Sequence, residues 1–336
     1  MKHPERILLA HGSGGRMTQE LIRELFLPAL ANPHLSLLSD AAVLPELPAG
    51  SRPVLTTDAF VVDPAIFPGG DLGYLSVCGT VNDLVVSGAK PLFLTWALVL
   101  EEGAPGDLIA ACTAGTSRAA AEAGVQVVAG DTKVVPRGKG DGIYITTAGL
   151  GALPGGRDWG DHRIEVGDAV MVTGPIGDHG ATIMACRHEI GGERLVSDCA
   201  PLASMIEKLV DAGVEIHAMH DPTRGGVIAT CNEVAGRSGK RMRLREEDVP
   251  VRDEVRAVCE LLGLDPLAVP CEGRALMWLS PPEAARACEM LEEGGAACIG
   301  SVEPAAAGRA RVTLVNALGA ERPLDLLSGM DLPRIC

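Results

Sequence analysis

The chain alternates strand-like and helix-like segments, and the alternation runs twice, on either side of a stretch rich in glycine and aspartate. Residues 154–170, PGGRDWGDHRIEVGDAV, form that stretch. The first run has predicted strands and helices at 52–63, 72–87, 91–102, 105–124, 125–130 and 142–153. The second has them near 168–174, 178–190, 200–213, 225–238, 251–263, 275–280, 297–303 and 310–315. The sequence therefore predicts a mixed α/β (α+β) protein with domains at 1–155 and 156–328 and a mobile tail at 329–336.

The composition is typical of an enzyme and disfavours nucleic-acid or membrane binding. Apolar residues make up 47% of the chain and charged residues 22%, which is enough to bury sizeable cores. The 41 glycines favour loops whose backbone approaches a ligand closely. The net charge of -15, without a Lys/Arg-rich run, disfavours nucleic acid and anionic membranes. No apolar run is long enough for a membrane span or a secretory signal, so we expect a cytoplasmic protein.

Most of the cysteines are explained as ordinary reduced thiols, whereas Cys336 has an unusual position in the sequence. None of the 10 cysteines belongs to a C-x-x-C pair, and most lie in apolar or Ala-rich stretches. This pattern favours reduced thiols over a zinc or disulfide framework. Cys336 is the last residue of the sequence, where side chains are usually replaceable.

Two glycine-rich turns precede predicted helices and are candidate anion sites. HGSGGR contains Gly12 and Gly14 and leads into MTQELIRELF, so its backbone N–H groups can converge at a helix N-terminus. A flexible N-terminal turn is the alternative. DPTRGG contains Arg224 and opens a second helix. A P-loop is excluded, because no G-x-x-x-x-G-K-[ST] occurs.

Several carboxylates lie where strands end or helices begin, which is typical of Mg²⁺ and phosphate sites. Charges next to apolar strands are costly unless a cation offsets them. Taken singly, each aspartate is better explained as a turn or cap residue, but together they favour a metal site: Asp40, Asp58, Asp83, Asp131 and Asp221. Lys133 is a candidate phosphate or oxyanion ligand, with a solvated surface lysine as the alternative. Glu272 is a candidate general base, with an ion pair to Arg274 as the alternative.

The chain resembles the HypE family of hydrogenase maturation factors from HGSGGR to its last residue. The resemblance rests on GTVNDLVVSGAKP, GDTKVV, GDHGA, LVSDCAPL, DPTRGGV and the terminal PRIC. GDTK and DPTRGG alone indicate only the wider superfamily of aminoimidazole ribonucleotide synthetase, selenophosphate synthetase and thiamine-monophosphate kinase. The resemblance implies a homodimer whose N-terminal halves join their sheets into a barrel, with ATP and Mg²⁺ near the interface. We also expect Asn82 and Thr147 among the nucleotide contacts.

The resemblance also implies a reaction on the tail itself. The carbamoyltransferase HypF loads a carbamoyl group on the terminal thiol, ATP-dependent dehydration makes a thiocyanate, and the cyanide passes to a HypC–HypD complex for the iron of [NiFe]-hydrogenase. The expected Mg²⁺–ATP ligands are Asp58, Asp83, Asp131 and Asp221, with Lys133 at the transferring group and Glu272 as the base. At Cys271 the chain departs from the family, whose members commonly carry Asn there.

The tail residues are expected to make Cys336 a tethered carrier. Gly329 supplies a hinge, Pro333 stiffens the tip, Arg334 pairs with phosphate or an acidic partner surface, and Ile335 is an apolar anchor. We expect a thiol pKa near the ordinary value of about 8.5. Another ATP-dependent synthetase or kinase of the superfamily, or a non-catalytic maturation scaffold, is the alternative function.

Overall fold

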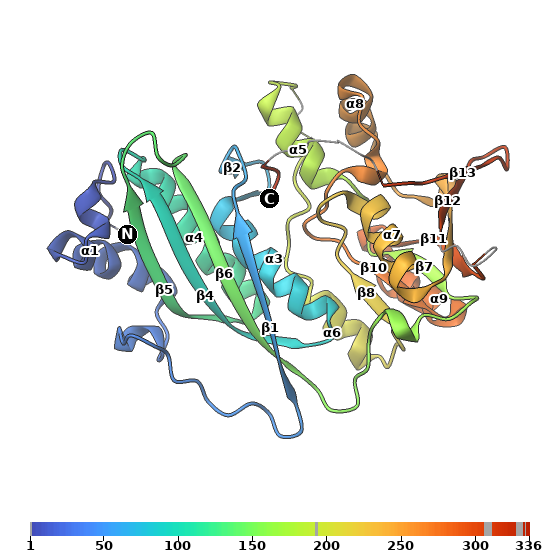
Figure 1. Ribbon diagram of the computed structural model, residues 1–336, viewed down its shortest axis with the longest axis horizontal. Coiled ribbons are helices and arrows are strands. Elements are labelled where there is room, and N and C mark those ends of the chain that lie inside the picture. The colour runs from blue at the N-terminus through green and yellow to red at the C-terminus, as the bar shows by residue number, and fades with distance from the viewer. Residues whose placement is uncertain (1, 192–193, 306–310, 327–331, 333) are drawn as a thin grey trace.

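The protein consists of an N-terminal half and a C-terminal half, each built on its own sheet. The computed structural model describes residues 2–191, 194–305, 311–326, 332 and 334–336 (Figure 1). The strand orders are β1-β6-β4-β5 and β13-β12-β9-β11-β7-β10-β8, and a small hairpin pairs β2 (Ile66–Phe67) with β3 (Gly70–Asp71). The N-terminus lies beside the outer edge of the first sheet, whereas the C-terminus lies between the two halves (Figure 1).

The N-terminal sheet contains β1 (Arg52–Phe60), β4 (Lys90–Glu101), β5 (Gln126–Val135) and β6 (Ile143–Leu153). Strand β6 pairs antiparallel with β1 and β4, and β4 pairs parallel with β5. That parallel pair needs a crossover, which α4 (Gly106–Ala123) provides. Helix α4 packs with α3 (Leu72–Val86) on one face of the sheet. The other face lacks such a cover within the described chain, and Leu55 there is 74% exposed.

The two helices on this sheet approach each other closely. A Cβ atom at Gly73 on α3 would lie 1.8 Å from the backbone carbonyl oxygen of Cys112 on α4. Only glycine fits at this position, because any Cβ atom would overlap the backbone of α4. The Asp71 carboxylate caps α3 by accepting a hydrogen bond from the Tyr74 N–H at 2.9 Å.

The N-terminal segment lies beside β5, at the edge opposite β1. It contains η1 (Leu9–Gly12), α1 (Arg16–Leu21), η2 (Ile22–Phe26), α2 (Leu27–Leu30) and η3 (Leu35–Leu37). A Cβ atom at Gly12 would lie 2.5 Å from the backbone nitrogen of Val134 on β5. Gly12 therefore allows this segment to lie directly on the strand.

The C-terminal sheet has buried central strands flanked by helices. Its strands are β7 (Ala169–Val172), β8 (Ala218–His220), β9 (Arg241–Arg245), β10 (Leu276–Leu279), β11 (Ala297–Glu303), β12 (Val312–Val315) and β13 (Glu321–Pro323). Its helices are α5 (Asp178–Arg187), α6 (Ala203–Asp211), α7 (Gly226–Ser238), α8 (Asp253–Leu262) and α9 (Pro281–Met290). Every residue of AVMV in β7 and LMWL in β10 is buried. Such unbroken apolar runs suit strands covered on both faces.

The structure contains the predicted elements in their predicted order, with two kinds of difference. Strand β5 does not stop at Gly130 but continues to Val135, because its partner β4 extends equally far. Strands β2, β3, β8, β9 and β13 and helices α2 and α9 were absent from the prediction. The mixed α/β class is correct, while the boundaries at 155 and 328 stay a prediction.

Candidate active site

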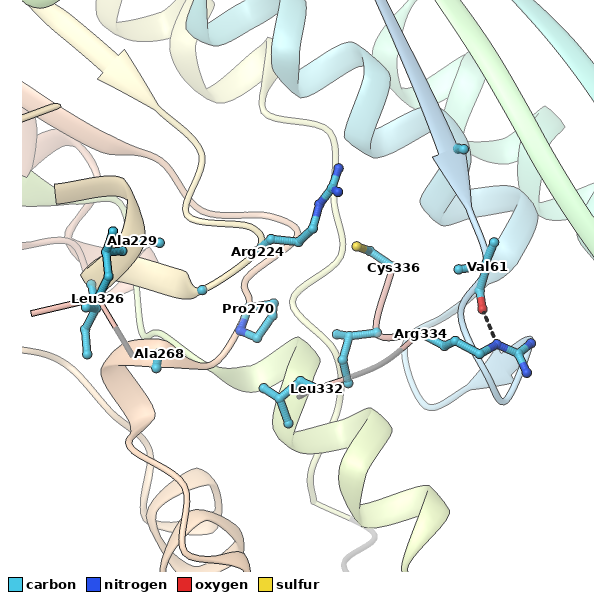
Figure 2. A pocket seen from close by; sticks show the side chains of 13 residues that line it. Val61, Arg224, Ala229, Ala268, Pro270, Leu326, Leu332, Arg334 and Cys336 are labelled. Atoms are coloured by element: carbon cyan, nitrogen blue, oxygen red, sulfur yellow. Dashed lines mark hydrogen bonds between the residues drawn. The ribbon is translucent and has the colours of Figure 1, made fainter. Parts of the chain in front are cut away.

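A cavity of about 440 Å³ lies between the two halves of the protein (Figure 2). The N-terminal half contributes Ala59 and Val61, at and just beyond the end of β1. The C-terminal half contributes Arg224, from the loop before α7, and Pro270. The end of the tail closes the cavity, and the Cys336 sulfur projects into it opposite Arg224 (Figure 2).

The tail end is held mainly through its backbone. The Val61 N–H donates to the Cys336 carbonyl oxygen at 3.1 Å, and the Asp63 N–H donates to the Arg334 carbonyl oxygen at 3.1 Å. The Arg334 side chain donates from Nε to the Val61 carbonyl oxygen at 3.0 Å and also pairs with Asp141. These contacts fasten the tail to the segment that follows β1. Gly329 and Pro333, for which a hinge and a stiffened tip were predicted, lie outside the described residues.

Ile335 supplies an apolar contact between the two hydrogen-bonded tail residues. Its side chain is 2% exposed and belongs to the main hydrophobic core. The geometry therefore combines backbone pairing with one buried side chain.

Three of the predicted aspartates approach this cavity. Asp58 on β1 accepts from the Thr80 hydroxyl at 3.0 Å, and Asp83 on α3 accepts from the Thr56 hydroxyl at 2.7 Å. Burial raises the pKa of both carboxyls, and the charge of Asp58 raises that of Asp83 further. Burial, with Asp83 nearby, raises the pKa of Asp221 to about 7. The three carboxylates therefore repel one another and would be stabilised by a cation.

Glu272 is buried beside these aspartates, and their charges add to the effect of its burial. It is 4% exposed, and its Oε1 atom has no hydrogen-bond partner within the described chain. Burial, followed by the charge of Asp221, raises its pKa well above the ordinary value. The alternative ion pair with Arg274 is wrong: that guanidinium lies 3.7 Å from Asp198 and donates to the Pro175 carbonyl oxygen.

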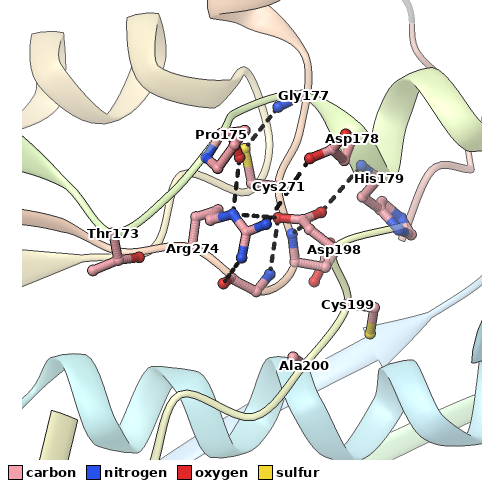
Figure 3. A network of polar contacts seen from close by, with 12 residues as sticks. Thr173, Pro175, Gly177, Asp178, His179, Asp198, Cys199, Ala200, Cys271 and Arg274 are labelled. Atoms are coloured by element: carbon pink, nitrogen blue, oxygen red, sulfur yellow. Dashed lines mark hydrogen bonds and ion pairs between the residues drawn. The ribbon is translucent and has the colours of Figure 1, made fainter. Parts of the chain in front are cut away.

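Cys271 packs inside the protein beside Glu272. It is fully buried, and its sulfur accepts a hydrogen bond from the Gly177 N–H at 3.2 Å (Figure 3). This residue therefore takes part in the packing under the site, and its sulfur is directed towards the turn before α5.

The Cys336 thiol differs from its predicted behaviour. Burial in the cavity, with the Glu272 carboxyl nearby, raises the pKa of Cys336 to about 12, against a smaller opposing effect of Arg224. The expectation of an ordinary thiol pKa is therefore wrong for the docked tail. It treated the tail as solvated and weighed only Arg334 and the terminal carboxylate.

The remaining predicted residues lie at the far side of the N-terminal sheet. Asp131 and Lys133 are exposed on β5 and form an ion pair at 2.7 Å, which holds the pKa of Asp131 below its usual range. Asp40 lines a separate cavity of about 270 Å³ with Asp131 and Thr18. Gly14 belongs to the same N-terminal segment, where its N–H donates to the Thr18 hydroxyl at 3.0 Å.

Strand register explains why Asp58 and Asp131 do not meet within one chain. Asp58 pairs with Thr147, Thr147 with Trp96, and Trp96 with Gly130, so Asp58 and Gly130 share one face of the sheet. Asp131 is the next residue and points to the opposite face. Three strand spacings also separate the two aspartates, about 14 Å along the sheet.

Asn82 and Thr147 are both buried, and their polar groups contact protein. The Asn82 amide donates to the carbonyl oxygens of Ala200 and Glu272 and accepts from the Leu202 N–H. Asn82 therefore ties α3 to two loops of the C-terminal half. The Thr147 hydroxyl pairs with the Thr80 hydroxyl, beneath Asp58.

Sequence reasoning missed three residues that organise the site: His179, Ser197 and Asp198. Asp198 accepts hydrogen bonds from the backbone N–H groups of His179, Glu272 and Gly273, at 3.1, 3.3 and 3.3 Å (Figure 3). The motifs GDHGA and LVSDCAPL contain these residues, but their spacing does not reveal that they meet.

The donor set fits Mg²⁺ only together with a phosphate ligand. The described residues include no group of three or more His, Cys, Asp or Glu side chains close enough to hold a metal ion. Mg²⁺ commonly takes one or two carboxylates and completes its shell with water and substrate phosphates. Asp58, Asp83 and Asp221 suit that mode, because their pKa values are raised by burial or by one another.

The fold and the cavity define a member of the AIR synthase related proteins. Residues 38–153 match the AIR synthase related N-terminal domain, and residues 165–313 match the corresponding C-terminal domain. Thiamine-monophosphate kinase from Aquifex aeolicus shares this fold at 20% identity, with a TM-score of 0.62. Within the described residues, no helix is long and apolar enough to cross a membrane.

The chain belongs to the HypE family. It is 42% identical to the carbamoyl dehydratase HypE of Rhodobacter capsulatus, covering 99% of this chain and 98% of that protein. It is 44% identical to the Escherichia coli HypE over 98% of this chain and 99% of the relative. A crystal structure of HypE in complex with ATP matches at 43% identity with a TM-score of 0.93, over 98% and 99% of the two chains. A HypE–HypF complex matches at 40% identity with a TM-score of 0.78, over 91% and 99%. The predicted family is confirmed.

Proposed function

We propose that this protein is an ATP-dependent carbamoyl dehydratase that acts on its own Cys336. The reaction converts an S-carbamoyl group into a thiocyanate, with ATP giving ADP and phosphate. One observation carries the proposal: the Cys336 sulfur lies in a cavity where Glu272 and Asp58 are close enough to raise its pKa. The HypE relatives named as carbamoyl dehydratases, and the HypE–ATP complex, support the same activity.

The chemistry has two requirements that this cavity can meet. The carbamoyl oxygen is a poor leaving group until it accepts the γ-phosphoryl group, after which it departs as phosphate. Arg224 lies opposite the sulfur and provides positive charge for that oxygen. Bound Mg²⁺ would neutralise phosphate charge, with Asp58, Asp83 and Asp221 as its ligands.

Glu272 is the proposed base for the nitrogen protons. Forming the nitrile removes both protons from the carbamoyl nitrogen. The first leaves when the oxygen accepts the phosphoryl group, and the second leaves as the carbon–oxygen bond breaks. A buried carboxylate with a raised pKa is a stronger base than an exposed one. The unpartnered Oε1 atom is available to accept such a proton.

We further propose that the active form is a homodimer joined through the open face of the N-terminal sheet. Leu55 lies there at 74% exposure, together with Asp131 and Lys133. A two-fold pairing of these faces allows the β5 edge of one copy to approach the β1 edge of the other. Such pairing would unite the two groups of predicted nucleotide ligands, with Lys133 reaching the γ-phosphate or the transferring oxygen.

The partners follow from the same reaction. The HypE–HypF complex supports a carbamoyltransferase of the HypF type as the carbamoyl donor. We propose that a HypC–HypD complex accepts the cyanide for the iron of [NiFe]-hydrogenase, and that these steps occur in the cytoplasm.

Intact-mass spectrometry of the wild type and Cys336→Ala tests the proposal. Each protein is loaded in a short reaction with a HypF-type carbamoyltransferase, carbamoyl phosphate and limiting ATP. The adduct is then freed of ATP, and its mass is measured before and after fresh ATP is added. We expect one carbamoyl group on the wild type alone, and loss of one water when ATP is present. An adduct that keeps its mass with ATP, or that forms equally on Cys336→Ala, would instead favour the scaffold alternative.

A further inference from the structure

A histidine that is 0% exposed contacts the last peptide group of the chain. The His179 Nε2 atom lies 2.8 Å from the Ile335 carbonyl oxygen, and the Nδ1 atom lies 2.8 Å from the Ser197 hydroxyl oxygen. The ring also packs edge-on against Phe67, with centroids 5.4 Å apart. Both ring nitrogens are therefore engaged, one with the tail and one with the protein.

These contacts determine the protonation state of the ring. A carbonyl oxygen only accepts hydrogen bonds, so Nε2 carries the proton and donates it to Ile335. Burial lowers the pKa of His179, so the ring is neutral and Nδ1 is the acceptor. Ser197 therefore donates its hydroxyl proton to Nδ1, which fixes the tautomer that the tail requires.

The Ser197 side chain is itself held in place. Its hydroxyl oxygen accepts a hydrogen bond from the Cys199 N–H at 3.1 Å, and its backbone N–H donates to the Pro68 carbonyl oxygen at 3.0 Å. The hydrogen-bond relay from Ser197 through His179 to Ile335 therefore begins in a loop of the C-terminal half, and this loop is hydrogen-bonded to the N-terminal half.

The next residue connects this relay to the proposed base. Asp198 accepts from the N–H groups of His179 and Glu272 and lies 3.7 Å from the Arg274 guanidinium (Figure 3). One carboxylate thus holds the backbone of His179, which contacts the tail, and of Glu272, whose charge acts on the Cys336 thiol. Ser197 and Asp198 are adjacent residues of one loop, so this loop positions both His179 and Glu272.

We propose that His179 is a positioning residue that holds the tail in the cavity through a hydrogen bond to the Ile335 carbonyl oxygen, and that Ser197 orients it by fixing its tautomer. The contact is made to a backbone group adjacent to Cys336, so it places the sulfur without touching the reacting atoms. The value of that placement for catalysis rests on the proposed function, but the docking itself does not.

Alkylation of the Cys336 thiol measures docking without ATP, HypF or turnover. The full-length protein is treated with a maleimide at fixed pH, and labelling of Cys336 is followed by peptide mass spectrometry. One net hydrogen bond contributes about a fivefold change in an equilibrium. We therefore expect His179→Ala to label about five times faster than the wild type. His162→Ala, which removes an exposed histidine, should label at the wild-type rate.

Three further variants separate hydrogen bonding from packing. His179→Gln keeps an N–H donor near the Nε2 position and should restore most of the protection. Ser197→Ala should label faster than the wild type, and the double variant should label no faster than His179→Ala.

The proposal would be overturned if Cys336 in His179→Ala were alkylated at the wild-type rate, or if His179→Gln were alkylated as fast as His179→Ala. If His179→Ala fails to fold, Ser197→Ala still tests the proposal. Labelling of Cys336 at the wild-type rate in Ser197→Ala would contradict the role of Ser197 in orienting His179. A protein that shows the expected labelling pattern but no dehydration would refute the proposed function and leave the tail contact standing.

Discussion

Replacing Glu272 with glutamine should make the protein more stable and much less active. The side chain is buried among carboxylates, and its Oε1 atom is unpartnered within the described chain. An unsatisfied buried polar atom costs about 1–3 kcal/mol. Gln has nearly the same shape, removes the charge, and its amide can donate to the carboxylates around it. We expect a gain of about 1 kcal/mol in the free energy of unfolding, or roughly 2–4 °C in the melting temperature.

The same substitution removes the proposed proton acceptor. General base catalysis typically contributes about 10²–10⁴-fold, so the dehydration rate should fall by at least about 100-fold. The assay is a single turnover: purified carbamoylated protein is mixed with ATP, quenched, and the mass of the Cys336 peptide is followed in time. Thermal unfolding of the same samples gives the stability change.

Glu207→Gln is the matched control, because Glu207 is 61% exposed and lies 3.7 Å from Lys90 in a surface ion pair. It should change neither quantity by a measurable amount. A Glu272→Gln protein that dehydrates at the wild-type rate would refute the base assignment. One that melts well below the wild type would refute the account of the buried carboxyl.

Three other substitutions test parts of the fold. Gly73→Ala should destabilise the protein by about 3 kcal/mol in urea unfolding, since the new Cβ would lie 1.8 Å from a carbonyl oxygen of α4; a loss below about 1 kcal/mol would contradict that contact. Burial alone would raise the pKa of Asp161, but hydrogen bonds from His220 and Arg237 lower it overall, so this carboxylate stabilises the fold above the unfolded pKa. Asp161→Asn should therefore cost about 1 kcal/mol at pH 7, and the cost should shrink as the pH falls through about 4; an unchanged cost would contradict the sign. Leu55→Glu should shift the protein from dimer to monomer in analytical ultracentrifugation, and a dimer of unchanged affinity would exclude the open sheet face as the interface.

The sequence predicted elements well where residue preference and end signals were clear. Strand β1 lies in a segment rich in Val and Thr, helix α3 ends just before Gly88, and both appear within a few residues of their predicted bounds. Strand β9, RMRLR, was missed because three arginines alternate with only two apolar residues, Met242 and Leu244. Helix α9 was missed for a similar reason, since few of its residues face the core.

The sequence predicted the site residues that lie in local motifs, but it did not predict which of them meet in the fold. The positions of Asp58 and Asp131 next to strands predicted that both bind the same Mg²⁺. The face of the sheet to which a strand residue points, however, depends on the pairing register, which a single sequence does not reveal. The partner of Arg274 is likewise distant in sequence: Asp198 lies 76 residues before it, whereas Glu272 is only two residues away. His179 lies in the motif GDHGA, but the motif does not reveal its contact with the tail, which spans 156 residues.

The docked position of Cys336 has a consequence for the order of events on the sulfur. A pocket that raises a thiol pKa to about 12 disfavours the anion and accepts uncharged sulfur. A thiol, a thiocarbamate and a thiocyanate all meet that condition, whereas the nucleophilic thiolate does not. The sulfur is therefore most reactive towards a carbamoyl donor when it is outside, and the loaded, neutral form returns without an electrostatic penalty. The cavity thus favours the uncharged sulfur inside it, and the thiolate is favoured only outside it.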